Sequence, residues 1–215
     1  MAVKLQTDIP EKTFNRSLKS IPSDWQEGVL KYDRASDRNL SLAGRLLLRN
    51  LMEQENILFN SPLKLSEKGK PYFSSDSDIN FSISHSGQMA VCAITSSGSV
   101  GIDLEQHREI DFKFLKSAMS EGQWSEILRS HDPRQTFFNL WTKKESITKA
   151  IGLGLYIPFH ALDVFQNPVK YEDQSWKTCE ILSDRRYHCH LAFSANIIQE
   201  IDVTVIDQGK VFRPF

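Results

Sequence analysis

The sequence has few cysteines, almost no net charge and no long apolar run. Its three cysteines are an odd number and none lies in a C-x-x-C pair, so we expect no disulfide framework. The formal net charge of −1 provides no overall basic field for nucleic acid. No apolar run approaches the roughly 18 residues that span a bilayer, and the N-terminus has no apolar signal core. We expect a cytoplasmic protein that binds neither nucleic acid nor a membrane.

What is present is an ordinary globular composition with clear periodic patterns. The 215 residues suffice for one large domain or two small packed ones. Apolar residues at the helical period predict helices over residues 36–53, 111–118, 121–130 and 133–151, with a shorter one near Trp25. Strand patterns occur at residues 80–85, 89–95, 100–105, 161–166, 177–182, 187–194 and 201–206, and a short strand is expected within residues 1–20.

The order of these elements predicts the fold class. Turns at residues 86–88 and 96–99 indicate that the strands around them form an antiparallel meander. Each half of the chain then offers a long helix and a small antiparallel sheet. We therefore predict an α+β fold of two similar lobes, an N-terminal lobe of residues 1–98 and a C-terminal lobe of residues 99–215.

Two carboxylates lie on one predicted strand, in the sequence VGIDLE at residues 100–105. Side chains alternate along a strand, so Asp103 and Glu105 share a face, with their Cα atoms about 6.5–7 Å apart. Buried together they would repel each other, and a hard divalent cation with oxygen ligands would remove that repulsion. The alternative is an edge strand with a solvated acidic face, and this hexapeptide alone does not decide between the two.

A third carboxylate lies on the predicted helix of residues 133–151. Trp141, Glu145 and Lys149 are spaced four residues apart and fall on one stripe. The acid could bind a metal or accept a proton, and the lysine could hold a phosphate. On this stretch alone, a surface Glu–Lys pair beside a core tryptophan is the favoured interpretation.

Other polar residues suggest an anion site. Ser84 and His85 end a strand at a turn, with Lys70 upstream, and the three could bind a phosphate. A Ser–His nucleophile is disfavoured because adjacent strand residues point to opposite faces. The alternative is a turn histidine satisfied by the backbone. His188 and His190 share a strand face, but no second ligand pair supports a zinc site there.

Taken together, three motifs favour the functional interpretations over the structural ones. They occur in the order FSISHS at residues 81–86, GIDLE at residues 101–105 and WTKKESITK at residues 141–149. Together they resemble the 4′-phosphopantetheinyl transferase superfamily, in its surfactin-synthetase-activating branch. The family pattern is roughly G-[IV]-D-x-E followed by W-x-x-K-E-[SA]-x-x-K, and every fixed position is met. Gly69-Lys70-Pro71 matches a further family motif. The resemblance spans about residues 30–165.

The resemblance implies a fold of two lobes with the active site between them, and an activity. The enzyme would use Mg²⁺ to move the 4′-phosphopantetheine moiety of coenzyme A onto a serine of an apo acyl or peptidyl carrier protein. Adenosine 3′,5′-bisphosphate would be released, and the protein would be a monomer. It leaves open whether the carrier belongs to fatty acid, polyketide or nonribosomal peptide synthesis.

The resemblance also implies roles for the acids and the helix lysines. Asp103, Glu105 and Glu145 would bind Mg²⁺, and Glu145 would be the candidate general base. Lys149 would neutralise the pyrophosphate, with Lys144 nearby. A binding module that has lost catalysis and a purely structural protein are the rival interpretations. The presence of all three acids and Lys149 favours the enzyme.

The resemblance further implies that residues of the Gly69-Lys70-Pro71 and FSISHS motifs hold the nucleotide. Lys70, Ser84 and His85 would contact its phosphates, including the 3′-phosphate. Arg38 would serve the adenosine end, together with Lys31 or Arg34.

Overall fold

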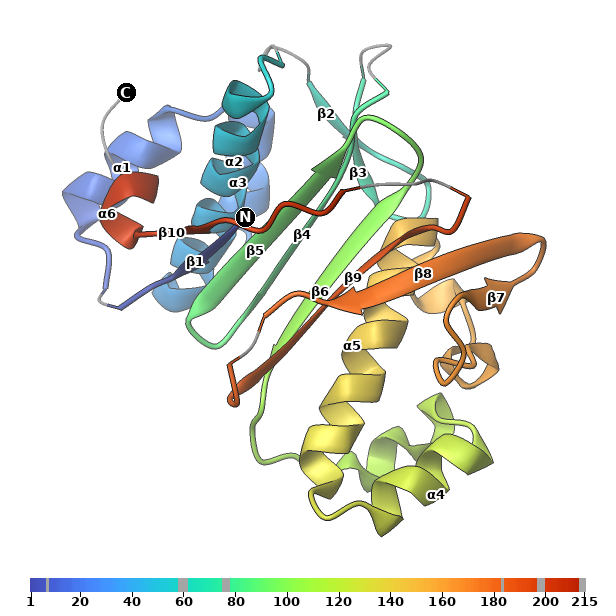
Figure 1. The fold of residues 1–215 in the computed structure, drawn as a ribbon. Coiled ribbons are helices and arrows are strands. Elements are labelled where there is room, and N and C mark those ends of the chain that lie inside the picture. Colours follow the sequence, from blue (N-terminus) through green and yellow to red (C-terminus); the bar gives the residue numbers. More distant parts are fainter. Residues whose placement is uncertain (7, 58–61, 75–77, 183, 197–199, 213–215) are drawn as a thin grey trace.

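The computed structural model describes residues 1–6, 8–57, 62–74, 78–182, 184–196 and 200–212. It is an α+β structure in which two four-stranded sheets lie next to each other, and each is covered by one long helix (Figure 1). This agrees with the predicted fold class. Among the described residues, no helix is both long and apolar enough to cross a membrane.

The first sheet has the strand order β10-β1-β5-β4. Its strands are β1 (Ala2–Lys4), β4 (Asn80–Ser86), β5 (Met89–Thr95) and β10 (Val205–Ile206). Helix α3 (Ala35–Gln54) packs on this sheet, and the shorter helices around it are α1 (Glu11–Lys19), α2 (Ser23–Leu30) and α6 (Gln208–Val211). A small hairpin of β2 (Leu63–Leu65) and β3 (Pro71–Phe73) places Lys70 in its turn region.

The second sheet has the order β6-β9-β8-β7 and is antiparallel throughout. Its strands are β6 (Val100–Gln106), β7 (Val169–Tyr171), β8 (Gln174–Glu180) and β9 (Tyr187–Ser194). Helix α5 (Pro133–Ile151) packs on β6 and β9, and α4 (Glu121–Arg129) packs on α5. The remaining turns are the 3₁₀ helices η1 (Phe112–Ala118), η2 (Gly154–Tyr156) and η3 (Phe159–Ala161).

Helix α5 begins and ends where its sequence signals indicate. The Asp132 side chain accepts a hydrogen bond from the Gln135 N–H at 3.0 Å, and Pro133 takes the first helical position. At the other end Gly152 adopts the left-handed conformation, with φ of 85°. These ends fix which turns of α5 face strand β6.

Gly101 allows α5 to approach β6 closely. A Cβ atom on Gly101 would lie 2.0 Å from the Ser146 carbonyl oxygen and 2.3 Å from the Ala150 nitrogen, both in the helix backbone. No rotamer change could relieve such a contact, so only glycine fits between the strand and the helix. The close approach brings Glu145 and Lys149 to the face of β6 that carries Asp103.

The two sheets meet along β4 and β6 through side chains. Three alternate serine hydroxyls of β4 accept hydrogen bonds from three alternate backbone N–H groups of β6: Ser82 from Ile102 at 3.0 Å, Ser84 from Leu104 at 3.3 Å and Ser86 from Gln106 at 3.1 Å. Apolar residues of both sheets bury the other face of this junction, namely Ala2, Met89, Val91, Val100, Ile102, Leu104, Tyr187, Cys189, Leu191 and Phe193. The serine contacts thus set how the second sheet sits against the first.

The structure differs from the expected strands in three places. Strand β6 pairs with β9 and not with β5, so the expected three-stranded meander is only the β4–β5 hairpin. The strand expected at residues 161–166 is absent from the described residues there, and β7 begins at Val169. The end of the chain does not stay with the second lobe, because β10 pairs in parallel with β1 of the first sheet. Helix α1 was not predicted.

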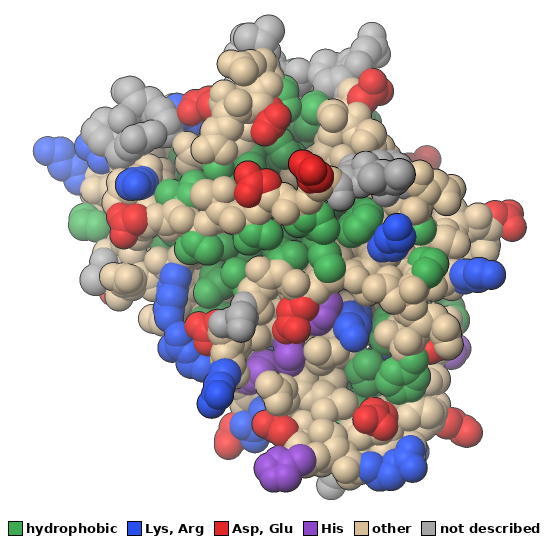
Figure 2. Space-filling view, viewed as in Figure 1, with side chains coloured by type: hydrophobic (Ala, Val, Ile, Leu, Met, Phe, Trp, Pro, Cys, Tyr) green, Lys and Arg blue, Asp and Glu red, His purple; other side chains and the backbone are tan. Residues whose placement is uncertain are grey.

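A wide groove of about 550 Å³ lies on the side of the sheets away from α5. Ile102 lines it, and strand alternation turns Asp103 to the opposite face. Figure 2 shows the hydrophobic side chains gathered across the middle of this side, near the segment that leads to β10. None of the residues singled out from the sequence lines this groove.

Candidate active site

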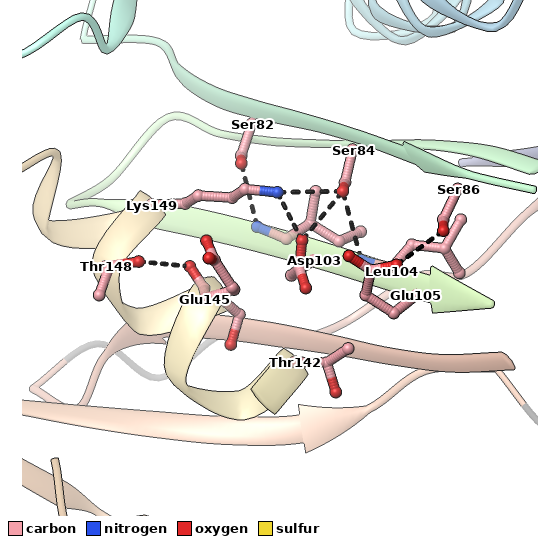
Figure 3. Close-up of polar contacts among 12 residues, drawn as sticks. Ser82, Ser84, Ser86, Asp103, Leu104, Glu105, Thr142, Glu145, Thr148 and Lys149 are labelled. Carbon is pink, nitrogen blue, oxygen red and sulfur yellow. Dashed lines mark hydrogen bonds and ion pairs between the residues drawn. The ribbon is translucent and has the colours of Figure 1, made fainter. Parts of the chain in front are cut away.

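Asp103 is the most buried of the three carboxylates, at 4% exposure on β6. Its Oδ1 accepts a hydrogen bond from the Lys149 Nζ at 2.6 Å and another from the Ser84 hydroxyl at 3.0 Å (Figure 3). Its Oδ2 is buried and has no hydrogen-bond partner. A buried carboxylate oxygen without a partner is costly, so this atom is available for a ligand that the protein alone does not supply.

Glu105 lies on the same face of β6 as Asp103, as strand alternation predicts. Its Oε2 accepts a hydrogen bond from the Ser86 hydroxyl at 2.8 Å. Burial raises the pKa of Glu105 and the charge of Asp103 adds to this, while the hydrogen bond from Ser86 works in the opposite direction.

Glu145 reaches the same region from helix α5 (Figure 3). Burial, followed by the charge of Asp103, raises the pKa of Glu145 to about 7. No described residue donates a hydrogen bond to its carboxylate. A carboxyl group with a pKa near neutrality can accept a proton from a substrate at physiological pH.

Lys149 is the cation closest to these acids. Burial alone would lower its pKa, but the charge and hydrogen bond of Asp103, with the charges of Glu145 and Glu105, outweigh burial and raise it. Its Nζ also donates to the Ser84 hydroxyl at 3.0 Å. One ammonium group among three carboxylates leaves the cluster negatively charged when all three are ionised.

This donor set fits a hard divalent cation such as Mg²⁺. All its donors are carboxylate oxygens, and Asp103 keeps one buried oxygen without a partner. Burial and the neighbouring acids raise the pKa values of Glu105 and Glu145, and a bound cation would oppose that effect. Among the described residues, no group of three His, Cys, Asp or Glu side chains already surrounds a metal position. Mg²⁺ usually takes only one or two carboxylates and completes its shell with phosphates and water.

A basic pocket of about 320 Å³ adjoins the carboxylates. Lys149 belongs to both, because it lines the pocket and pairs with Asp103. The other basic residues of the lining are Arg45, Lys68, Lys70 and His85, and the described lining contains no Asp or Glu. A concave surface with cations and no carboxylate is suited to a phosphorylated ligand.

Lys70 and His85 lie in this pocket, where the sequence motifs suggested. The Lys70 Nζ donates to the Ala150 carbonyl at the end of α5, at 2.8 Å, and burial lowers the pKa of Lys70 to about 8. The His85 ring packs edge-on against Tyr32, with centroids 5.7 Å apart. Burial and then the charge of Lys149 lower the pKa of His85. An anion in the pocket would favour the charged forms of both groups and so oppose these shifts.

Arg45 is a pocket residue that the sequence analysis did not select. It extends from α3, and its Nη1 donates to the carbonyl oxygen and the hydroxyl of Ser41, at 3.0 and 2.7 Å. Its Nε is buried without a partner, and burial lowers the pKa of Arg45. The helical spacing was the available signal, because Arg45 lies two turns after Arg38 and on the same stripe of the helix.

Arg38 does not line the pocket. It is half-buried near the start of α3, outside the described lining, and Lys31 and Arg34 are exposed nearby. Arg45 stands where we had expected Arg38 to act, because the side chains nearest the pocket come from the middle of the helix.

Ser84 does not line the pocket either. Its hydroxyl donates to Asp103 and accepts from the Leu104 N–H and from Lys149, which uses its proton and both lone pairs. In the structure Ser84 thus contacts the carboxylate and the lysine, and its expected direct contact with a phosphate stays a prediction.

Lys144 was expected near the nucleotide, and the structure contradicts this. The side chain is fully buried, and its ammonium group donates to the backbone carbonyls of Phe159 and Leu162. Burial lowers the pKa of Lys144 to about 8. It ties α5 to the η3 segment and faces away from Lys149, because the five helical positions between the two lysines turn their side chains about 140° apart around the helix.

Comparison with known proteins assigns the chain to a protein family. Residues 99–205 match the family model described as the 4′-phosphopantetheinyl transferase superfamily, and residues 9–97 match the model of a 4′-phosphopantetheinyl transferase N-terminal region. The 4′-phosphopantetheinyl transferase gsp of Aneurinibacillus migulanus is 38% identical over 173 residues, which cover 77% of this chain and 70% of that protein. The chain belongs to the 4′-phosphopantetheinyl transferase superfamily.

Further relatives place this transferase in the Sfp-type branch. The 4′-phosphopantetheinyl transferase Sfp of Bacillus subtilis (strain 168) is 29% identical over 166 residues, covering 75% of this chain and 74% of that protein. The human L-aminoadipate-semialdehyde dehydrogenase-phosphopantetheinyl transferase is 31% identical over 203 residues, covering 86% of this chain and 65% of the relative. The chain is thus an enzyme of the phosphopantetheinyl transferase type.

Proposed function

We propose that this transferase moves the 4′-phosphopantetheine moiety of coenzyme A onto a serine hydroxyl of an apo carrier protein, in a Mg²⁺-dependent reaction that releases adenosine 3′,5′-bisphosphate. The acceptor would be an acyl or peptidyl carrier protein. The observation that supports this most strongly is the position of Lys149, which pairs with Asp103 at 2.6 Å and also lines the basic pocket. A pyrophosphate lying beside Lys149 would have one side toward cations and the other toward the carboxylates.

The basic pocket would hold the nucleotide end of coenzyme A. Lys70, His85 and Arg45 surround one space and lack a carboxylate partner there, so a phosphate can take their free donors. At about 320 Å³ the pocket is large enough for part of a nucleotide and not for the whole of coenzyme A. The pantetheine arm would therefore extend out of it toward the carrier protein.

Asp103, Glu105 and Glu145 would hold the Mg²⁺ between them and the pyrophosphate. When bound, the ion would neutralise the pyrophosphate oxygens and so allow a nucleophile to approach. Lys149 would hold the leaving phosphate and neutralise part of its charge, while Ser84 keeps Lys149 and Asp103 in register.

Glu145 would act as the general base. The serine oxygen of the carrier forms a bond to the phosphorus that carries pantetheine, and the P–O bond of the pyrophosphate breaks. The leaving adenosine 3′,5′-bisphosphate takes the bonding electrons, and the serine proton passes to Glu145. The burial of Glu145 on α5, beside Asp103 and Lys149, and the absence of a hydrogen bond to its carboxylate from the described residues support this role.

A monomeric, cytoplasmic enzyme without a nucleic-acid or membrane partner remains part of the proposal. The three cysteines are unpaired, which supports a reducing compartment.

We test the nucleotide site with His85→Ala, using coenzyme A and dephospho-coenzyme A, which lacks the 3′-phosphate. If His85 contacts that phosphate, its loss removes one hydrogen-bonding partner of a charged group, which is worth about tenfold or more in kcat/KM. We expect the variant to lose that factor with coenzyme A and much less with dephospho-coenzyme A. Steady-state kinetics with one purified apo-carrier measures both.

The control for this comparison is His160→Ala, an exposed histidine outside the pocket. It should leave the ratio of kcat/KM for the two substrates at the wild-type value. Equal losses by His85→Ala on both substrates would move His85 away from the 3′-phosphate.

A further inference from the structure

Ser86 connects the end of β4 to the second carboxylate of the site. Its hydroxyl donates to the Glu105 Oε2 at 2.8 Å and accepts from the Gln106 N–H at 3.1 Å. We propose that Ser86 is a positioning residue, which holds the Glu105 carboxylate in the orientation that a bound Mg²⁺ requires. This rests on the proposed function, because it deepens the role of Glu105 there.

The two hydrogen bonds leave the Ser86 hydroxyl little freedom. A serine has one O–H to donate, and accepting from a fixed backbone N–H of β6 restricts the directions in which that proton can point. The hydroxyl donates this proton to Glu105, which lies on β6 two residues after Asp103. In Figure 3 the Ser86 side chain extends from the neighbouring strand toward Glu105. Carboxylates that bind a metal are commonly held by such a second hydrogen bond.

The turn that follows Ser86 is itself held in place. Gly87 has a φ of 60°, and a Cβ there would lie 2.2 Å from the Gln106 side-chain oxygen and 2.8 Å from the Tyr187 hydroxyl oxygen. The Gln88 N–H donates to that same Tyr187 hydroxyl at 3.2 Å. The end of β4 is therefore fixed against both β6 and β9, and Ser86 can transmit this fixed position to Glu105.

Ser82 provides a matched comparison within the same row. It accepts a hydrogen bond from the Ile102 N–H at 3.0 Å, as Ser86 does from Gln106, but it contacts no carboxylate. Removing the Ser82 hydroxyl would weaken the junction of the two strands without releasing a carboxylate. Because Ser82 also lines the basic pocket, coenzyme A affinity is measured separately for this variant. Removing the Ser86 hydroxyl would weaken the same junction and also release Glu105. Any difference between the two substitutions reports on the carboxylate.

The experiment compares Ser86→Ala, Ser86→Thr, Ser86→Val and Ser82→Ala with the wild type. Calorimetry measures Mg²⁺ affinity in the presence of saturating coenzyme A, and separately measures coenzyme A affinity in EDTA. Thermal unfolding follows the strand junction. We expect Ser86→Ala to weaken Mg²⁺ binding about tenfold or more, the usual effect of losing a partner that orients a metal ligand. Coenzyme A affinity in EDTA should stay at the wild-type value.

The other variants separate positioning from simple loss of structure. Ser86→Thr keeps the hydroxyl and should restore Mg²⁺ affinity, whereas Ser86→Val has the same shape without it and should behave like Ser86→Ala. This pair also decides the question if Ser86→Ala folds poorly. Ser82→Ala should lower the unfolding temperature and leave Mg²⁺ affinity unchanged.

Two results would overturn the inference. If Ser86→Ala and Ser82→Ala weaken Mg²⁺ binding equally, the serines only hold the strands together. If Ser86→Val binds Mg²⁺ as well as Ser86→Thr, the hydroxyl does not position Glu105. Failure of the wild type to bind Mg²⁺ with coenzyme A would instead contradict the proposed metal dependence, and Ser86 would then have no metal ligand to position.

Discussion

A Glu145→Gln enzyme is expected to lose at least about 100-fold in kcat while binding coenzyme A with only modestly lower affinity. Glutamine has nearly the same shape and keeps one carbonyl oxygen, but it cannot accept the serine proton. In the structure Glu145 extends from α5 into the same region as Asp103 and Lys149, where the proposed pyrophosphate would lie. The helix should still fold, since Trp141 stays packed against Phe137 and Phe159.

The measurement pairs a single-turnover rate with calorimetric affinity for coenzyme A and Mg²⁺. Glu11→Gln, an exposed glutamate of α1, is the control and should match the wild type in both. If affinity falls as far as the rate, Glu145 is chiefly a metal ligand and another group takes the proton. If neither changes, the helix motif is structural and the proposed mechanism is wrong.

Asp103→Ala is expected to abolish measurable transfer. The substitution removes a buried carboxylate that accepts hydrogen bonds from Lys149 and Ser84, and whose Oδ2 is free to bind a metal. Glu105 cannot replace it, because Glu105 lies two residues further along β6 and its carboxylate is held there by Ser86 of β4. Coenzyme A should still bind, more weakly, through the basic pocket. Transfer to an apo-carrier and coenzyme A affinity are measured on the same preparation.

The substitution should also lower the stability of the fold. Breaking a fully buried ion pair costs about 3–5 kcal/mol, and the cost should be smaller here because the Lys149 side chain is 31% exposed. Asp184→Ala is a matched control, since Asp184 accepts from Arg186 at 3.0 Å in the turn between β8 and β9. Asp184→Ala should keep full transfer. Near wild-type turnover by a folded Asp103→Ala enzyme would show that Asp103 is not part of the active site.

Local patterns in the sequence predicted the local structure well. Helix α5 follows its apolar period and ends at Gly152, and β6 turns Asp103 and Glu105 to one face. These features depend on the period of the side chains and on single capping residues, both of which can be read along the chain.

Pairing between distant strands was not predictable in the same way. The sequence of β6 fits a partner on either side, and only the complete fold selects β9 over β5. The parallel pairing of β10 with β1 joins residues near opposite ends of the chain, and no local pattern specifies it. Apolar alternation tells which face is buried but not against which strand.

Side-chain partners in the site were also beyond a sequence-based prediction. Lys144 and Lys149 lie on the same helix, one directly before Glu145 and the other one turn after it. Lys144 is buried against backbone carbonyls, whereas Lys149 reaches Asp103. The difference comes from which segments happen to pack on each side of α5. Arg45 was overlooked for the same reason, because its burial in the pocket depends on how α2 and β4 approach α3.

The most direct test of the account is the intact mass of an apo-carrier protein after incubation with this enzyme and coenzyme A. With Mg²⁺ present, we expect the carrier to gain the mass of one phosphopantetheine group at a serine, together with release of adenosine 3′,5′-bisphosphate. With EDTA in place of Mg²⁺, the mass should not change. A carrier panel that stays unmodified with Mg²⁺, while the folded enzyme binds coenzyme A, would contradict the proposed function and favour a binding module without catalysis.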